Sequence, residues 1–457
     1  MKAFAHELGP RETIPLPLVF ILLFYSGTVI ALQNLFPVLE AFYPQTIFAS
    51  IAILLSVVSF FCGNASLKLE RIQKLYAVYC TIAILGLYRS FEVGFLAQGG
   101  EIVFNFLKHL VFIVILVSFT RTLSVLIFLR NWILITCALF ILHSIKAIYA
   151  GNTGLGGRFD NYIGLISNAD YIGVFVAVFV VIFFHIALQI RNNKYRLLCF
   201  ALSIGSLVIM VKTQTRSAIL VLSAVLFWWV VIMSTSIIKF FKNMTVFFWV
   251  IATAFIVGSF NESLLNPYLD RILTIKQATS TDADFNAKSR LFMWKQGIEL
   301  GLANPLLGVG SGASTPHLDL NYEGVELQNR MSNVKGFSMH NTFIEIFAER
   351  GVIGLVLFCL MLLAAYRNFT AIARYATKHP ERQQLEILAA VGRLYLVGYS
   401  VGAMFISIEY DWTLFVFLAL AVSSQQYMHE NELTTPGRGN SMRISAWHHH
   451  SNEMEKL

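Results

Sequence analysis

SAILVLSAVLFWWVVIM, at residues 217–233, is an apolar run without a single charge, and it decides the fold class. Comparable runs are LPLVFILLFYSGTVIAL at residues 16–32 and MTVFFWVIATAFIVGSF at residues 244–260. Each approaches the roughly 20 residues that a helix needs to cross about 30 Å of hydrocarbon. Inside lipid the backbone must satisfy its own polar groups, so such runs form helices. The sequence therefore predicts an all-α membrane protein.

Composition extends this prediction to the whole chain. Of its 457 residues, 56% are hydrophobic and only 13% are charged, which is about half the charged share of an ordinary soluble domain. We expect a polytopic protein with about twelve transmembrane helices. These lie near residues 17–35, 46–63, 75–93, 102–119, 131–150, 169–190, 197–212, 217–236, 244–260, 342–365, 386–407 and 411–425.

The distribution of Lys and Arg predicts the orientation of the chain. With a cytoplasmic amino terminus, every predicted inner loop is basic, whereas the outer turns 35–45 and 94–101 contain no Lys or Arg. Such a bias is typical of membrane topology, so the net charge of +8 needs no nucleic-acid partner. The inner cations are Lys68, Arg71 and Lys74, then Arg121 and Arg130, then Arg191, Lys194 and Arg196, then Lys239 and Lys242, then Arg367, Arg374, Lys378 and Arg382.

Five segments follow from this topology. We expect N-terminal transmembrane helices in 1–150, central transmembrane helices with outer cationic turns in 151–260, an outer (periplasmic) loop domain in 261–340, C-terminal transmembrane helices in 341–425 and a cytoplasmic polar tail in 426–457. No small-residue cleavage signal ends the first apolar run, so it is interpreted as a retained helix. In the outer loop, Leu291, Trp294 and Ile298 recur at helical spacing, which predicts a short amphipathic helix on the membrane surface.

Neither a metal nor a cofactor is expected. The five cysteines all lie in apolar runs without the spacing of metal ligands or of a disulfide framework. A cluster of three histidines at 448–450 could bind a metal, but a polar tail without order accounts for it better.

Several cations contradict the topological bias and therefore need a reason. Arg158, Lys212 and Arg216 occupy predicted outer turns, and Arg290 and His340 belong to the same side of the membrane. A lone Arg216 would serve equally well as a helix-end anchor. Together, however, these side chains predict a pocket rich in positive charge. Guanidinium groups bind phosphate oxygens bidentately, so the pocket suits a diphosphate.

His340 and the helix that follows it are the remaining candidates. The pKa of an unperturbed histidine lies near neutrality, so His340 could take a proton from an attacking hydroxyl, although a polar cap is the common role at a helix start. Gly351 and Gly354 most simply permit close helix packing. Glu345 and Glu349 either orient a site residue or line a polar face. Ionisable residues within predicted spans should face protein or water, without an assigned role; these are Lys108, His109, His143, Lys146 and Arg393.

These motifs together resemble the superfamily of O-antigen ligases and O-antigen polymerases. The family pattern of His, then a small polar residue, nine residues and Gly-x-x-Gly is met by His340, Asn341, Gly351 and Gly354. KTQTRSA resembles the family's short outer turn with an essential arginine, which corresponds to Arg216.

Two further stretches share the resemblance, which covers roughly residues 150–425. SRLFMWKQGIELGLANPLLGVGSG is similar to the family's periplasmic segment, with Arg290 at the basic position, and GRFDNYIGLISNADYIG is similar to the stretch that opens the central region, with Arg158 at the basic position.

The resemblance implies a metal-independent glycosyltransferase of the GT-C type in a bacterial inner membrane, with both termini cytoplasmic and a periplasmic active site. The donor would be an undecaprenyl-diphosphate-linked glycan, and the acceptor a hydroxyl of lipid A-core or another glycan. His340 would act as general base, or orient the acceptor. Arg216 and Arg290 would hold the diphosphate, with Arg158 and Lys212 as secondary contacts, and transfer would invert the sugar carbon.

Other functions remain open. The favoured function is an O-antigen ligase, because the histidine motif is complete and the outer loop is of moderate size. A repeat-unit polymerase and a protein O-oligosaccharyltransferase share the family architecture. A transporter or flippase also has about twelve helices, but neither broken spans nor inverted repeats are evident in the sequence.

Overall fold

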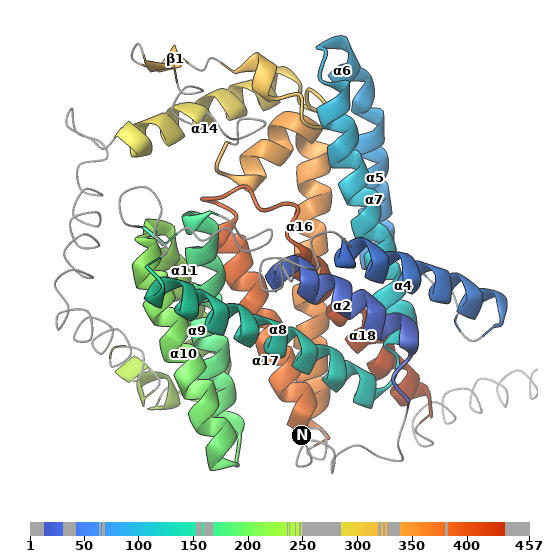
Figure 1. Ribbon diagram of the computed structural model, residues 1–457, viewed down its shortest axis with the longest axis vertical. Helices are drawn as coiled ribbons and strands as arrows, with labels where there is room; N and C mark the ends of the chain where they lie inside the picture. Colours follow the sequence, from blue (N-terminus) through green and yellow to red (C-terminus); the bar gives the residue numbers. More distant parts are fainter. Residues whose placement is uncertain are drawn as a thin grey trace, which may run out of the picture.

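Apolar helices form the membrane-embedded part of the protein, as the computed structural model shows (Figure 1). The structure describes residues 13–30, 43–63, 65, 69–151, 158–159, 168–234, 236, 238–242, 244–245, 248, 285–318, 321–322, 325–326, 339–379 and 383–434. Two short strands, β1 (Asn321–Tyr322) and β2 (Val325–Glu326), pair antiparallel, and the 3-10 helix η4 (Thr315–His317) precedes them. The other elements are α-helices, as predicted.

The helices follow one another with short connections. In the first half of the chain they are α2 (Leu16–Ile30), α4 (Pro44–Phe61), α5 (Arg71–Leu85), α6 (Leu87–Glu92), α7 (Leu96–Phe119), α8 (Leu123–Tyr149), α9 (Ala169–Gln189), α10 (Asn193–Thr213) and α11 (Arg216–Met233). The second half contains α14 (Phe285–Ala303), α16 (Thr342–Thr377), α17 (Gln383–Gly402) and α18 (Trp412–Thr434).

The predicted spans agree with these helices wherever the structure describes them. Eight helices are long and apolar enough to cross a membrane, namely α4, α7, α8, α9, α10, α11, α16 and α17. The prediction of about twelve also counted α2 and α5, which have only 15 residues each, and α18, whose second half is polar. The last predicted span, 244–260, lies almost entirely outside the described residues. The chain is thus a multi-pass membrane protein.

Helix α9 forms the centre of the bundle, where nearly all of its side chains are buried. Helix α17 approaches it closely because Gly398 and Gly402 face it one turn apart. A Cβ added at Gly398 would lie 2.4 Å from Val178 Cγ2, and one at Gly402 would lie 2.4 Å from Val174 Cγ1. Small residues allow such contact between helices in lipid. The packing also fixes the α17–α18 connection next to the outer end of α9.

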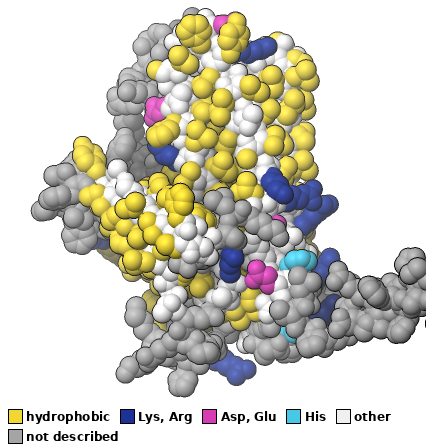
Figure 2. Space-filling model, turned by 90° about the vertical axis from the view of Figure 1, so that its right-hand side faces the viewer, with side chains coloured by type: hydrophobic (Ala, Val, Ile, Leu, Met, Phe, Trp, Pro, Cys, Tyr) yellow, Lys and Arg dark blue, Asp and Glu magenta, His cyan; other side chains and the backbone are white. Residues whose placement is uncertain are grey.

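The lateral face over α4 to α7 is largely apolar, as Figure 2 shows for the right-hand side of Figure 1. Most of α4 is not buried by the rest of the described chain, and Leu54, Val58 and Phe61 are among its exposed side chains. Exposed leucine, valine and phenylalanine are stable in hydrocarbon but not in water. This face therefore fits a lipid environment.

Helix α14 lies across one end of the bundle, above α16 in Figure 1. Its Gly297 and Gly301 pack on the start of α16, where an added Cβ would lie 2.6 Å from Ile344 Cγ2 and 2.4 Å from Phe347 Cδ1, respectively. Of the apolar residues predicted to face the membrane surface, Leu291 and Ile298 are exposed. Trp294 instead bonds within the protein, so that part of the predicted apolar face belongs to the core of the outer region.

Candidate active site

A single carboxylate, Asp170, joins two of the predicted outer cations. It lies in the first turn of α9, where its Oδ1 accepts a 2.5 Å contact from a terminal nitrogen of Arg158 and its Oδ2 accepts a 2.5 Å contact from Arg290. Arg158 also donates through Nε to the carbonyl of Thr213 at 2.9 Å. Hydrogen bonds between ionised partners are among the strongest in proteins. Residues 120 positions apart in the chain are therefore held at one point.

The α10–α11 turn completes this cluster from a third side. Gln214 adopts a left-handed conformation with φ of 51° and ends α10. The next residue, Thr215, donates to the carbonyl of Ala169 at 3.0 Å and also lies 3.2 Å from Asp170 Oδ1. Arg216 follows as the first residue of α11. The turn that carries Arg216 is thus anchored on the same carboxylate that binds Arg158 and Arg290.

The close approach of this turn depends on a glycine in α9. A Cβ at Gly173 would lie 2.7 Å from Thr213 Oγ1 and 2.8 Å from Thr215 Cβ. The backbone of Lys212 contributes as well, since its carbonyl accepts a 2.9 Å bond from the Phe159 amide. The predicted secondary cation Lys212 therefore belongs to the same turn.

His340 joins the cluster through α14. Trp294 lies one helical turn after Arg290, and its indole Nε1 donates a 3.0 Å bond to the carbonyl of Met339. His340 itself is left-handed, with φ of 52°, which is uncommon for a residue other than glycine. Burial and the positive charge of Arg290 lower the pKa of His340 to about 4, an effect that Asp170 opposes. The imidazole is therefore neutral at physiological pH and lies within the electrostatic reach of both charged partners.

Asn341 caps the helix that follows. Its side-chain oxygen accepts from the amides of Phe343 and Ile344 at 3.0 Å and 3.1 Å. This is the role that the sequence offered as an alternative for His340, and the structure gives it to Asn341 instead. Thr342 then fixes the helix start to the α17–α18 connection, because its hydroxyl donates to Ile406 at 2.7 Å and accepts from Ile408 at 3.0 Å.

Gly351 has a different role from the helix packing expected of it. Its φ of 64° and ψ of −167° interrupt α16, so one long helix is in fact two segments. A Cβ there would lie 2.3 Å from the carbonyl carbon of Leu306, which is backbone of the connection after α14. Gly354, one turn later, accommodates Arg350, whose Cβ would lie 2.5 Å from an added methyl group. The two motif glycines therefore shape a break, and the close contact is with a loop and with α16 itself.

The loop after α14 satisfies the backbone groups that this break leaves unpaired. The amides of Val309 and Gly310 donate to the carbonyls of Ala348 and Glu349 at 2.9 Å and 3.0 Å, and the Val352 amide donates to the carbonyl of Pro305 at 2.7 Å. Unpaired backbone groups are costly at membrane depth, so an interrupted helix requires such partners. The outer loop and α16 are therefore a matched pair.

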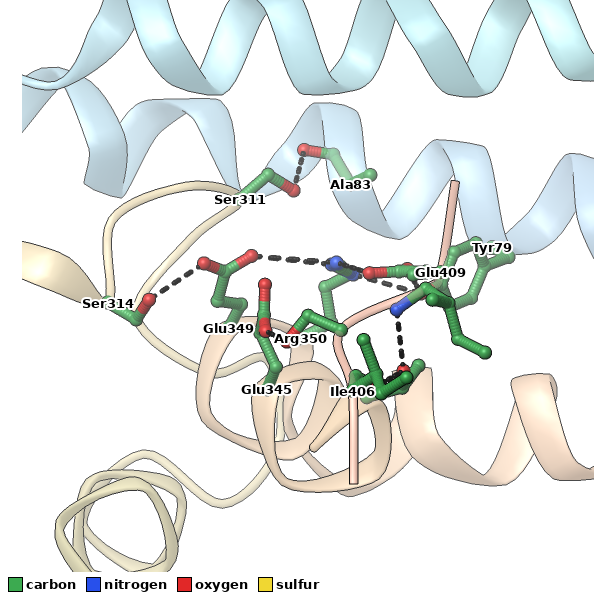
Figure 3. Close-up of polar contacts among 12 residues, drawn as sticks. Tyr79, Ala83, Ser311, Ser314, Glu345, Glu349, Arg350, Ile406 and Glu409 are labelled. Carbon is green, nitrogen blue, oxygen red and sulfur yellow. Dashed lines mark hydrogen bonds and ion pairs between the residues drawn. The ribbon is translucent and has the colours of Figure 1, made fainter. Parts of the chain in front are cut away.

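Arg350, on the turn before Gly351, is the centre of a buried ionic cluster that sequence reasoning missed (Figure 3). Its side chain is fully buried, lies 2.5 Å from Glu409 and 3.5 Å from Glu349, and donates to the Tyr79 hydroxyl at 3.1 Å. Tyr79 in turn donates to Glu409. The cluster thus links α5, α16 and the α17–α18 connection.

Two serines extend this cluster. Ser314 in the outer loop donates to Glu349 at 2.9 Å, and Ser407 in the α17–α18 connection donates to Glu345. Of the two roles considered for Glu345 and Glu349, both therefore bind protein groups rather than only lining a polar face. A buried arginine with a hydrogen-bonded carboxylate partner fixes neighbouring segments relative to one another.

The intramembrane ionisable residues occupy varied surroundings. His109 is buried and stacks on Phe415 with ring centroids 4.0 Å apart. Arg393 donates to the carbonyl of Ala389, one turn earlier. Lys108 and Lys146 are exposed, and the Lys108 ammonium lies 4.4 Å from the ring centroid of Phe104. None of the printed contacts connects these residues to the cluster at Asp170.

The site therefore confirms the expected proximity for part of the predicted set. Arg158 and Arg290 share Asp170, and Arg216 and Lys212 lie in the turn anchored beside it. Asp170 was missed because the search concentrated on cations. An acidic residue at the first turn of a span, beside misplaced arginines, was the signal available in the sequence.

Chemically, the arrangement suits an anionic ligand next to a neutral base. Arg158 and Arg290 carry two positive charges against the single charge of Asp170, and Arg216 and Lys212 add two more nearby. The side chains of Arg158 and Arg290 retain 22% and 32% of their surface exposed, so both guanidiniums have a face outside the carboxylate contact. Such groups stabilise negative charge without rearranging during a reaction.

Comparison with known proteins supports this chemistry. Residues 200–359 match the protein family described as O-Antigen ligase. The chain is also similar to the exopolysaccharide production protein ExoQ of Rhizobium meliloti (strain 1021), with 32% identity over 114 residues, which cover 25% of this chain and 26% of that protein. The matched family region contains Arg216, Arg290 and His340, whereas Arg158 and Asp170 precede it. The resemblance to the O-antigen ligase and polymerase superfamily is confirmed.

Proposed function

On the premise that residues 200–359 carry the features of the O-antigen ligase family, we propose that the protein transfers a glycan from undecaprenyl diphosphate to an acceptor hydroxyl of lipid A-core. The reaction takes place at the cluster around Asp170 and His340, on the periplasmic face of a bacterial inner membrane. The observation that carries the proposal is the pair of arginines on one carboxylate, next to a neutral histidine.

The donor diphosphate binds the guanidiniums. Arg290 and Arg216 are its main partners, and Arg158 and Lys212 are secondary contacts. Arginine remains charged at every relevant pH and offers several donors in one plane. When the bond between the sugar carbon and the phosphate oxygen breaks, the leaving diphosphate gains negative charge, and fixed guanidiniums stabilise it. This step requires neither a metal nor a cofactor.

His340 serves as the general base. The acceptor oxygen attacks the anomeric carbon, the carbon–oxygen bond to the diphosphate breaks, and the hydroxyl proton passes to the imidazole. Direct displacement inverts the configuration at that carbon. The positive charge of Arg290 lowers the pKa of His340. A bound diphosphate places negative charge beside the imidazole, which raises its pKa again and makes it a better base.

The outer orientation of the site is part of the proposal. It is tested by single cysteines in a cysteine-free chain, labelled in whole spheroplasts with a membrane-impermeant maleimide. Leu302 at the end of α14 and Lys378 after α16 are both exposed. We expect labelling of L302C before lysis and of K378C only after lysis. The reverse pattern would exclude a periplasmic site.

A second candidate is a repeat-unit polymerase, which the similarity to an exopolysaccharide production protein favours. Donor binding and the role of His340 are the same in both functions. The acceptor differs, because a polymerase adds the glycan to the end of another carrier-linked chain. A protein acceptor is a third possibility within this family architecture.

Deletion of the gene distinguishes these functions. Loss of a ligase leaves full-length polymer on the carrier, whereas loss of a polymerase leaves lipid A-core with at most one repeat. The purified protein is then reconstituted with the lipid-linked glycan from the deletion strain and with each acceptor. We expect transfer to lipid A-core without ATP, and loss of transfer in His340→Ala and Arg216→Ala. Full activity of either variant contradicts the assigned roles, and absence of any covalent product would favour a transporter or flippase.

A further inference from the structure

Asp170 is an acidic residue at the centre of a site that should bind an anion, which calls for an explanation. Resting on the proposed function, we infer that Asp170 is a positioning residue that sets the spacing of Arg158 and Arg290, so that the donor diphosphate meets two guanidiniums in a fixed geometry. The carboxylate itself does not contact the donor.

The first support is geometric. Each oxygen of Asp170 binds a different arginine at 2.5 Å, so the separation of the two guanidiniums is limited by the width of one carboxylate. Without it, two like charges would repel, and Arg290 would lose its printed anchor among the described residues. Arg158 would keep its 2.9 Å bond to the Thr213 carbonyl. Loss of Asp170 therefore frees one arginine more than the other.

The second support is the rigidity of Asp170 itself. Its amide donates to the side chain of Asn168 at 2.8 Å, which caps α9, and Thr215 lies 3.2 Å from Oδ1. A carboxylate in the first turn of a helix is also stabilised by the helix dipole. These contacts come from two elements, so the carboxylate has little freedom to follow the arginines.

The third support is relative exposure. The side chain of Asp170 is 13% exposed, against 22% for Arg158 and 32% for Arg290. An arriving ligand therefore meets the guanidiniums before the carboxylate. The trio has a net charge of +1 (two arginines minus one aspartate), and Arg216 and Lys212 in the adjoining turn increase the attraction for an anion.

This assignment predicts that binding and turnover respond differently to substitution. Asp170→Asn removes a negative charge, so affinity for an anionic donor is kept or increased. The arginines lose their common anchor, so the diphosphate is bound in poorer geometry. A misplacement of about 1 Å costs up to about 100-fold in rate. We expect kcat to fall at least about tenfold.

The experiment uses the full-length protein in nanodiscs. Binding of undecaprenyl diphosphate is measured by native mass spectrometry, and kcat and KM are measured with lipid-linked glycan from the deletion strain. Asp170→Asn should bind at least as tightly as the wild type with reduced kcat, and Asp170→Glu should recover part of kcat because it keeps the charge. Glu299→Gln, an exposed acidic residue of α14 paired with Lys295 at 3.8 Å, is the matched control and should change neither quantity.

Wild-type kcat in Asp170→Asn overturns the inference, as does a loss of affinity with unchanged kcat. If Asp170→Asn does not fold, Asp170→Glu decides, because a longer carboxylate that supports wild-type kcat would show that spacing is not set here. Failure of the proposed function has a different signature. Arg290→Ala with unchanged affinity for undecaprenyl diphosphate would remove the diphosphate site, whatever Asp170 does.

Discussion

Trp294 holds the backbone of Met339 through a 3.0 Å hydrogen bond from its indole nitrogen, and Met339 immediately precedes His340. One turn earlier on the same helix, Arg290 binds Asp170 at 2.5 Å. Helix α14 therefore connects the guanidinium proposed to bind the diphosphate with the segment that carries the proposed base. An error in the placement of α14 would disturb both functions together.

Substitution of Trp294 by Phe tests this connection. The variant keeps an aromatic ring beside Phe405 but removes the donor to the Met339 carbonyl. A buried acceptor left without a partner costs about 1–3 kcal/mol. We expect turnover to fall by about tenfold or more, since about 1.4 kcal/mol corresponds to a factor of ten. The control is Trp228→Phe, which loses a 3.1 Å bond to Tyr366 away from the site and should retain activity. Wild-type turnover in Trp294→Phe contradicts the role of α14.

The pH dependence of activity tests the state of His340. Its pKa of about 4 lies below the ordinary value of 6.5 because of burial and Arg290. The acid limb of kcat/KM, which reports the free enzyme, should therefore fall near pH 4, and that of kcat should lie at higher pH because bound diphosphate raises the pKa. His317→Gln, in the exposed η4, is the control with an unchanged profile. An acid limb of kcat/KM near pH 6.5 would refute this.

The same shift predicts how stability depends on pH. The unfolded state takes up a proton on His340 as the pH falls through 6.5, whereas the folded state does so only near pH 4. The folded protein is therefore destabilised progressively between these values and not further below them. Thermal unfolding of wild type and His340→Gln should diverge across this window. Parallel curves would show that the histidine is not buried in the neutral form.

Sequence patterns predicted the helices well because hydrophobic length alone determines what crosses a membrane. They also selected Arg158, Arg290 and His340, because cations on an outer face are rare enough to be noticed. Asp170 was not found, since a lone carboxylate gains its meaning only from arginines distant in sequence. Arg350 was likewise missed, because its partners Glu409 and Tyr79 come from other helices. Whether Arg216 contacts a donor is still a prediction.

Gly351 shows why local reasoning about α16 was wrong. The spacing of the two glycines resembles a packing motif, and nothing nearby in the sequence indicates a broken helix. The break is stable only because a loop some 40 residues earlier supplies its hydrogen bonds, as with Val309 to Ala348 at 2.9 Å. Such compensation depends on tertiary structure and has no local signature.

Replacement of Gly351 by Ala therefore should be severe. Its φ of 64° is strained for any residue with a Cβ, and the added methyl group would meet Leu306 backbone at 2.3 Å. Backbone strain of this kind costs about 1–3 kcal/mol, and the clash adds to it. Gly100→Ala in α7 is the matched control, because nothing lies within 4 Å of its added Cβ. We expect a much lower melting temperature for Gly351→Ala and an unchanged or higher one for Gly100→Ala, since alanine favours helices. Equal melting temperatures would argue against the break.

The buried pair of Arg350 and Glu409 supplies the last prediction. Arg350→Met leaves Glu409 without its counter-charge in a fully buried setting, which costs about 3–5 kcal/mol in measured cases. The double variant Arg350→Met with Glu409→Leu removes both charges and should be less destabilised than the single one, because hydrophobic replacement of a whole pair is often tolerated. Lys295→Met breaks the exposed pair with Glu299 and should change stability by less than about 1 kcal/mol. Denaturation in detergent measures all three. A double variant weaker than Arg350→Met alone would show that Glu409 stabilises the fold through Tyr79 rather than through Arg350, since the Tyr79 hydroxyl is its other donor.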